Sequence, residues 1–364
     1  MHFYIESYVV KKLLWIITIL ATVCSLPVFF LPYISPAQFP LSAYAFVLIP
    51  IIILVNIILL IILWTFLSPY KALLPLLTLL FGFPYVKRTI SILHPEVKGK
   101  GDFSVLSYNV RVFNVYAHLQ DEHQNSSRKM LDWIIKNDAA VACFQEFYNN
   151  DYSPLFCSIK KIKSSFPYYY YVPSYHDNSN GTFGMAIFSR YPIIYSGFVP
   201  FEEENNNKVI YSDIKIGKDT LRVFNMHLQS LHITDSIILE ARIKEIGINE
   251  LEYLMKIIKQ GAVKRSKQIG LLNDYIKKSP YRVIICGDLN DTPYSYSYQK
   301  LSNLLNNTFE KAGKGFGFTY ISKMPLRIDN QFADDRLFIK SFKVCDSIPY
   351  SDHYPIEASY SLKN

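Results

Sequence analysis

An apolar run becomes abruptly polar in the stretch Arg282-Val283-Ile284-Ile285-Cys286-Gly287-Asp288-Leu289-Asn290. Its first five residues predict a short buried strand, and Pro293 stops that strand soon afterwards. Because residues i and i+2 of an extended segment point the same way, Asp288 and Asn290 are expected to converge just beyond the carboxyl end of the strand. An Asx turn that caps the next helix would explain the same two residues, and the pair alone does not separate these interpretations.

Three other predicted strands also end in polar side chains. Asn225 and His227 repeat the i, i+2 spacing, although a lone histidine after a strand is more often structural than catalytic. Glu146 ends a very apolar strand, where a carboxylate is costly unless a hard cation or a lysine neutralises it. Asn109 ends another strand and by itself is an ordinary turn residue.

The last polar group stands near the end of the chain, where Asp352 and His353 are adjacent. Neighbouring residues of a regular strand face opposite ways, so these two side chains can share a site only from a turn. Asp329 is a candidate to hold the histidine in one tautomer. Five such strand ends predict a single site at one edge of a pair of sheets. The site suits metal-assisted attack on phosphorus, which needs a carboxylate to activate water, a carboxylate to hold a cation, and donors for the phosphate charge.

The N-terminal quarter of the chain is nearly uncharged, with no Asp, Glu, Lys, Arg or His from residue 13 to residue 70. Residues 13–33 and 43–67 each supply the roughly 20 apolar residues that a membrane-spanning helix needs. The second run argues against a cleaved signal peptide. Residues 72–86 are also uncharged, but this run is short and contains proline and glycine. It predicts either a third span or a helix in the membrane interface.

The number of spans decides which side of the membrane the rest of the chain faces. Lys11, Lys12 and Lys71 favour a cytoplasmic amino terminus, so three spans place the soluble part outside and two keep it inside. Lys87 and Arg88 pull toward the inside, yet we favour three spans and an extracytoplasmic domain. The predicted organisation is a membrane anchor with two or three transmembrane helices over residues 1–92, a linker over 93–101, and a catalytic domain over 102–364.

The part after the apolar region has the composition of a soluble protein. From Lys87 onward the chain carries 35 basic and 29 acidic residues, a formal net charge of +6. This modest charge is compatible with an anionic substrate or an anionic membrane surface and does not require nucleic acid. The five cysteines show no metal-binding spacing, and an odd number disfavours a disulfide framework.

Strands and a few helices follow one another in this part without a repeat of fixed period. The glycine-rich segment 313–317 lacks the preceding strand and following helix of a nucleotide-binding loop, so it predicts a turn. Residues 233–278 predict one helix, or two that meet near Gly261. The order favours an α/β or α+β layered domain. Strands are expected at 103–109, 140–145, 184–189, 208–216, 221–227, 282–286, 328–332, 340–345 and 355–362, and shorter helices at 126–136 and 296–305.

Six short motifs occur in a specific order: Ser107-Tyr108-Asn109, Phe144-Gln145-Glu146, Asn225-Met226-His227-Leu228, Gly287-Asp288-Leu289-Asn290, Arg327-Ile328-Asp329 and Ser351-Asp352-His353. Together they resemble the endonuclease/exonuclease/phosphatase superfamily over about residues 101–364, and the apolar start is similar to a membrane-anchored bacterial subgroup. The resemblance implies a four-layer α/β sandwich of the deoxyribonuclease-I type, with two packed mixed sheets and helices outside. It also implies phosphoester hydrolysis that depends on Mg²⁺ or Mn²⁺.

The resemblance implies roles around the metal ion and the attacking water. Glu146 would be the principal metal ligand, with Asn109 beside it and Asp352 as a further ligand. Asp288 would activate or orient the water, and Asn290 would position that water and the phosphate.

The remaining roles concern the phosphate. Asn225 and His227 would contact the phosphate or the transition state, and His353, oriented by Asp329, would stabilise the pentacovalent phosphorus. After Asp329 the family usually has an aromatic residue or a histidine and then aliphatic residues. This chain has Asn330-Gln331-Phe332 instead, which puts the local strand contacts in question.

The leading hypothesis is a membrane-anchored, metal-dependent phosphoesterase of the bacterial inner membrane, acting on a phosphodiester or a phosphomonoester. Its partners would be the phosphoester substrate and the lipid bilayer, and the tether favours a lipid-derived substrate. A metal-dependent nuclease is the alternative, but nucleic acid is not favoured because the charge is modest and no basic-aromatic groove is evident. A non-catalytic interaction module is a second alternative. It predicts losses among Glu146, Asp288, Asp329 and His353, and all four are present.

Overall fold

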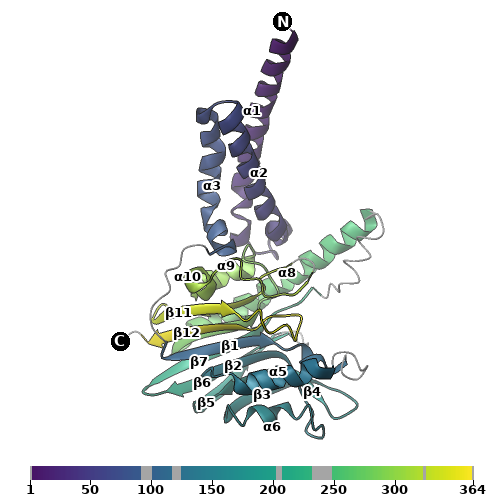
Figure 1. Cartoon of the computed structure of the whole chain (residues 1–364), viewed down its shortest axis with the longest axis vertical. Coiled ribbons are helices and arrows are strands. Elements are labelled where there is room, and N and C mark those ends of the chain that lie inside the picture. Colours follow the sequence, from purple (N-terminus) through teal and green to yellow (C-terminus); the bar gives the residue numbers. More distant parts are fainter. Residues whose placement is uncertain are drawn as a thin grey trace.

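Three long helices lead into a domain built on two packed sheets (Figure 1). The computed structural model describes residues 2–91, 101–116, 124–201, 207–231, 248–322 and 325–362. The helices stand together at the top of Figure 1, and the sheets lie below them. The predicted linker, residues 93–101, falls almost wholly outside the described residues.

Residues 2–91, called the anchor below, contain the helices α1 (His2–Val28), α2 (Ala45–Phe66) and α3 (Pro69–Thr89), with the short turns η1 (Leu31–Tyr33) and η2 (Pro40–Tyr44) between the first two. All three helices are long and apolar enough to cross a membrane, so the third apolar segment is a full-length helix. It continues through Pro75 and Pro84. Gly82 lets the ring of Phe29 lie against α3, because a Cβ at this position would come within 2.7 Å of that ring.

The first sheet has six strands in the order β11-β12-β1-β2-β4-β3. β1 and β2 run parallel and the other described neighbours are antiparallel, so the sheet is mixed. The strands are β1 (Phe103–Asn109), β2 (Val141–Asn149), β3 (Tyr168–His176), β4 (Thr182–Ser189), β11 (Leu337–Val344) and β12 (Ile356–Leu362).

The second sheet also has six strands, in the order β5-β6-β7-β8-β10-β9. Here β7 and β8 form the parallel pair. The strands are β5 (Ile193–Val199), β6 (Lys208–Ile216), β7 (Asp219–His227), β8 (Arg282–Asp288), β9 (Asn306–Asn307) and β10 (Asp329–Ala333).

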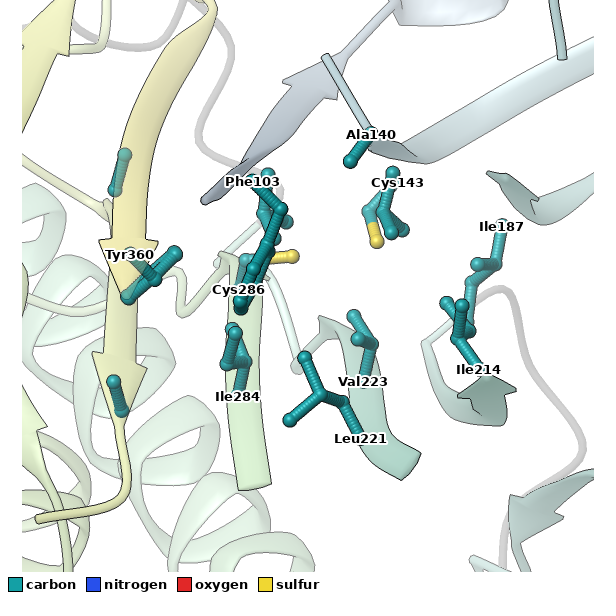
Figure 2. Packing of buried hydrophobic residues seen from close by; sticks show 14 of the residues in the cluster. Phe103, Ala140, Cys143, Ile187, Ile214, Leu221, Val223, Ile284, Cys286 and Tyr360 are labelled. Atoms are coloured by element: carbon teal, nitrogen blue, oxygen red, sulfur yellow. The ribbon is translucent and has the colours of Figure 1, made fainter. Parts of the chain in front are cut away.

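Apolar side chains from the inner faces of both sheets pack together in one core. Figure 2 shows Cys143 and Ile187 of the first sheet with Val223, Ile284 and Cys286 of the second. Helices cover the two outer faces: α5 (Gln124–Lys136) and α6 (Ser158–Ile162) on the first sheet, α8 (Ile248–Lys277) and α9 (Tyr296–Ser302) on the second. The short helix α10 (Thr308–Ala312) lies beside β11. These layers confirm the predicted α/β sandwich with three apolar helices before it.

Three local expectations differ from the structure. The strand expected to end at Gln145 continues to Asn149 as part of β2, and β5 was not expected at all. The helix α8 does not divide near Gly261 but runs through it. A Cβ at this glycine would come within 2.5 Å of the Leu231 side chain, so the residue serves close packing. Residues 233–247, the start of the expected helical segment, lie outside the described residues.

Candidate active site

Strand register brings three acidic or imidazole side chains into one row. β7 pairs with β8 so that His227 lies beside Asp288, and β8 pairs with β10 so that Asp288 lies beside Asp329. Paired strands lie about 4.8 Å apart, so these side chains stand within reach of one another. All three are buried, which strengthens the electrostatic interactions among them.

The end of β8 and the turn after it aim the carboxylate of Asp288. Gly287 has a φ of +134°, and a Cβ there would lie 2.0 Å from the carbonyl oxygen of Met226, so the position requires glycine. The backbone N–H of Asn290 donates a 2.8 Å hydrogen bond to Oδ1 of Asp288, and its Nδ2 donates to the carbonyl oxygen of Leu228 at 3.0 Å. The Asx turn therefore forms, and Oδ2 of Asp288 faces Asn109 of the other sheet.

The parallel pair of the first sheet contributes an amide and a second carboxylate. Asn109, at the end of β1, donates through Nδ2 to Oε1 of Glu146 and to Oδ2 of Asp288, at 3.2 Å in both cases. Glu146 occupies a β-bulge, because the register with β4 shifts between Phe144 and Phe147, and its φ is +50°. A bulge redirects a side chain within a strand. This explains how Glu146 reaches the site although β2 continues past it.

Two imidazoles complete the group. Nε2 of His227 lies 3.7 Å from Oε1 of Glu146 and 3.8 Å from Oδ2 of Asp288. Nε2 of His353 lies 3.8 Å from the same Asp288 oxygen, and its Nδ1 lies 2.8 Å from Oδ2 of Asp329. Asp329 is thus placed to fix the orientation and the protonated form of His353.

Asp352 lies at the margin of this group. Its Oδ2 is 3.5 Å from Nε of Arg111, and its Oδ1 is 3.1 Å from the hydroxyl of Ser351. The Ser351 hydroxyl also lies 2.8 Å from the carbonyl oxygen of Asn109. The metal-ligand role of Asp352 stays a prediction.

Asn225 lies between the two sheets. Both N–H groups of its amide are engaged, with the carbonyl oxygens of Phe144 at 2.9 Å and Ala186 at 3.0 Å. Its Oδ1 accepts a 2.6 Å hydrogen bond from Gln145, a residue for which the sequence motifs predicted no role. A contact of Asn225 with phosphate would require these bonds to rearrange, so that role also stays a prediction.

Comparison with known proteins agrees with this geometry. Residues 106–243 and 261–353 match the model described as the Endonuclease/Exonuclease/phosphatase family. The chain belongs to this family. The match includes every residue of the candidate site. Residues 11–89 match a second model, described as a domain of unknown function (DUF8431). No curated protein matches the chain.

Several solved structures share the fold. One is an endonuclease/exonuclease/phosphatase family protein from Leptotrichia buccalis C-1013-b, with 16% identity and a TM-score of 0.51 over 71% of this chain and 98% of that chain. Another comes from Beutenbergia cavernae DSM 12333, with 13% identity and a TM-score of 0.53 over 73% of this chain and 72% of that chain. A family protein from Bacteroides thetaiotaomicron has 16% identity and a TM-score of 0.50 over 71% and 97%. At these identities the likeness concerns the fold alone.

Charges within this endonuclease/exonuclease/phosphatase site shift one another's protonation. Burial, and after it the charge of Asp329, raise the pKa of Asp288 to about 6. Burial by itself would lower the pKa of His353, but the carboxylates of Asp329 and Asp288 outweigh it and raise that pKa to about 10. Near neutral pH the site therefore holds a cationic His353 beside an ionised Asp288.

The donor set fits a hard divalent cation. Ligand atoms of Asp288, Asp329 and His353 lie within 4.8 Å of one another, but Asp329 and His353 already contact each other. Glu146 is more accessible, with its side chain 37% exposed, and burial by its neighbours raises its pKa despite the hydrogen bond from Asn109. Carboxylates are preferred by Mg²⁺ and Mn²⁺, and the role of Glu146 as the principal metal ligand stays a prediction. Asn109 faces the acids with its N–H group and would need its amide turned over to act as a ligand.

Backbone in the left-handed region adjoins the site. Arg111 to Asn114, which begin two residues after Asn109, all have φ between +42° and +54°. Residues other than glycine adopt this conformation at a cost of about 1–2 kcal/mol each. The segment is held by hydrogen bonds from the N–H of Arg111 to Oδ1 of Asn109 and from the Ser127 hydroxyl to the carbonyl oxygen of Phe113. Such strain is typical of functional sites.

Proposed function

We propose that this protein is a membrane-anchored phosphoesterase that uses a divalent cation and an activated water to hydrolyse a phosphodiester or a phosphomonoester. The main support is the group formed by Glu146, Asp288, His227 and His353, in which the imidazole nitrogens lie 3.7–3.8 Å from the carboxylate oxygens. Two acids and two imidazoles at this spacing offer a base, a metal ligand and donors for phosphate in one place.

Each side chain has a role that its surroundings support. Asp288 is ionised at neutral pH yet basic enough, with a pKa of about 6, to take a proton from water. Asn290 holds that carboxylate in place through its backbone N–H. His353, kept cationic by Asp329, is suited to stabilise negative charge that develops on the phosphate. His227 is a second donor beside it.

The family implies Mg²⁺ or Mn²⁺ as cofactor, and Glu146 is the residue that would hold the ion, with Asp352 and the Asn109 amide nearest to contribute. When bound, the ion would supply charge neutralisation at a phosphate oxygen.

The position of the site relative to the anchor favours a lipid substrate. Tyr44 of η2 donates a 3.1 Å hydrogen bond to the carbonyl oxygen of Met255 in α8. Ten residues further, about 15 Å along a helix, Arg265 donates to the carbonyl oxygen of Gln229 and pairs with Asp291. Gln229 and Asp291 follow the site residues of β7 and β8. If the apolar helices span a bilayer, η2 lies at its surface and the site lies near the headgroups.

The proposal includes the side of the membrane on which the catalytic domain lies. With three spans and a cytoplasmic amino terminus, the catalytic domain lies on the extracytoplasmic side of a bacterial inner membrane. Reporter fusions after Tyr33, Lys71 and Lys100 test this, because an external domain requires the last fusion to report the side opposite to the amino terminus.

The function is tested with a substrate panel on the full-length protein in vesicles with Mg²⁺: sphingomyelin, phosphoinositides, bis-p-nitrophenyl phosphate, and plasmid or abasic DNA. We expect a lipid phosphoester to be hydrolysed faster than DNA, and activity to disappear with EDTA or in His353→Ala. Asp132→Asn, which changes an exposed acid on α5, is the matched control and should retain activity. Cleavage of DNA without lipid hydrolysis would favour the nuclease alternative, and inactivity toward the whole panel would favour the non-catalytic one.

A further inference from the structure

Residues 313–321 begin with the glycine-rich segment 313–317, and this segment contacts the anchor at its start. Ser91, just after α3, pairs with Gly315 through two backbone hydrogen bonds of 2.9 Å. The Ser91 hydroxyl donates to the carbonyl oxygen of Gly313 at 2.6 Å. Gly315 and Gly317 have φ of +66° and +62°, so the chain turns here in a conformation that favours glycine. The turn expected from the sequence is therefore a docking point for the end of α3.

Residues 313–321 hold the Asp329–His353 pair at their other end. The hydroxyl of Thr319, which is fully buried, accepts hydrogen bonds of 3.1 Å from the N–H groups of Asp329 and of the residue before it. The carbonyl oxygen of Thr319 accepts a 2.7 Å hydrogen bond from the N–H of Tyr354. The ring of Tyr320 stands edge-on to the His353 imidazole, with 5.1 Å between centroids. Thr319 thus contacts the backbone at Asp329 and at the residue that follows His353.

A second connection runs through a buried arginine two residues before Asp329. Nη2 of Arg327 donates to the carbonyl oxygen of Arg88, in the last turn of α3. Nη1 of Arg327 donates to the carbonyl oxygen of Phe316, inside the glycine-rich segment, and the guanidinium lies 3.7 Å from the ring centroid of Phe309. A buried guanidinium that loses an acceptor is costly, so the place of Arg327 depends on α3 being docked.

Arg88 fastens the end of α3 to the domain. Its Nη2 donates to Oε1 of Gln299 at 2.6 Å, and its Nη1 donates to the carbonyl oxygen of Pro293 at 3.3 Å. The guanidinium also lies 5.3 Å from the ring centroid of Tyr298. The side chain is only 8% exposed, so these contacts are made away from bulk water.

We propose that Thr319 is a positioning residue for the Asp329–His353 pair, and that the docked end of α3 fixes the segment that carries Thr319. The anchor then orders the active site as well as tethering it, an inference that rests on the proposed phosphoesterase function. Because one connection starts in the last turn of α3 and the other at Ser91 just after it, loosening this turn should displace Asp329 and His353 although no anchor residue enters the site.

The role of Thr319 is tested with two variants of the full-length protein and the water-soluble substrate bis-p-nitrophenyl phosphate in Mg²⁺. Thr319→Val keeps the shape of the side chain and removes the acceptor, so kcat should fall by about 10- to 100-fold with little change in KM, as a small misplacement of catalytic groups does. Thr319→Ser restores the hydroxyl and should restore kcat. Wild-type kcat in Thr319→Val, or an equal loss in Thr319→Ser, would overturn the proposal.

The role of α3 is tested by amide hydrogen exchange, which does not depend on activity. Arg88→Met should speed exchange at the amides of Asp329 and Tyr354, which Arg88 does not touch. Arg222→Met is the matched control, because this substitution removes a comparable pairing, that of Arg222 with Asp213. The pairing lies toward the end of β7 that is opposite to His227. Unchanged exchange at these amides in Arg88→Met, or the same increase in both variants, would refute the link. If the wild type hydrolysed none of the substrates, the exchange result would still decide whether α3 orders the pair.

Discussion

Nδ1 of His353 lies 2.8 Å from Oδ2 of Asp329, and both side chains are buried. The aspartate starts an antiparallel strand and the histidine follows a turn near the end of the chain, so neither is placed by its own sequence neighbours alone. The hydroxyl and carbonyl groups of Thr319 hold the backbone beside each of them. The contact keeps His353 cationic and leaves its Nε2 on the side of Asp288.

Asp329→Asn should lower kcat toward bis-p-nitrophenyl phosphate by about 10²- to 10⁴-fold, the range expected when a positioned acid or base fails. The carboxylate of Asp329 is the largest contribution that raises the pKa of His353. A raised histidine pKa keeps the cation up to about pH 10, and the cation is lost as the pH rises through that value. In the variant the cation should be lost at a lower pH, so the alkaline limb of the pH profile of kcat should shift to lower pH. Asp334→Asn, at the other end of β10, should leave that limb in place.

Mg²⁺ should raise the melting temperature more at about pH 8 than at about pH 5. The pKa of Asp288 is raised, so the folded protein holds this proton more tightly than the unfolded chain does. In EDTA the resulting stabilisation is present at low pH and is lost as the pH rises through about 6. A cation held by Glu146 stands near the ionised Asp288, because Asn109 contacts both carboxylates, and it offsets the repulsion that remains above that pH. Equal rises in melting temperature with Mg²⁺ at both pH values would contradict this coupling, and Asp288→Asn should reduce the pH dependence, while the raised pKa of Glu146 leaves a part of it.

Glu146→Gln should remove most of the stabilisation by Mg²⁺ and lower kcat by a factor on the order of 10²–10³. The substitution keeps the size of the side chain and its place in the bulge but removes the charge that would hold the cation. Thermal unfolding with and without Mg²⁺, together with hydrolysis of bis-p-nitrophenyl phosphate, measures both effects. Asp132→Asn on α5 is the control and should behave as the wild type. If Mg²⁺ raised the melting temperature of Glu146→Gln as much as that of the wild type, the metal site would instead be assigned to the group of Asp288, Asp329 and His353.

The sequence could predict the meeting of strand ends because parallel strands bring their carboxyl ends to the same edge. Asn109, His227 and Asp288 all end such strands. The bulge at Glu146 could not be predicted in this way, since it arises from pairing with β4, far along the chain. The edge strand β5 was missed because its partly exposed residues show no clear alternation.

Local sequence patterns also could not predict features that depend on residues far along the chain. The left-handed backbone of Arg111 to Asn114 contains no glycine, and its support comes from α5 and Asn109. The segment 313–317 looked like an ordinary turn, because its partner Ser91 belongs to the anchor. Gly261 looked like a helix break, and only the approach of Leu231 explains a glycine there.

Two glycines should respond to alanine in opposite ways. At Gly287 the φ of +134° and the 2.0 Å approach of the Met226 carbonyl oxygen to a Cβ leave no room, so Gly287→Ala should cost about 1–3 kcal/mol or more and displace Asp288. At Gly270, on the exposed side of α8, a Cβ meets nothing within 4 Å, so Gly270→Ala should stabilise the protein by roughly 0.5–1 kcal/mol. Melting temperature and hydrolysis of bis-p-nitrophenyl phosphate distinguish the two. Wild-type hydrolysis by Gly287→Ala would mean that the turn after β8 does not aim the carboxylate of Asp288.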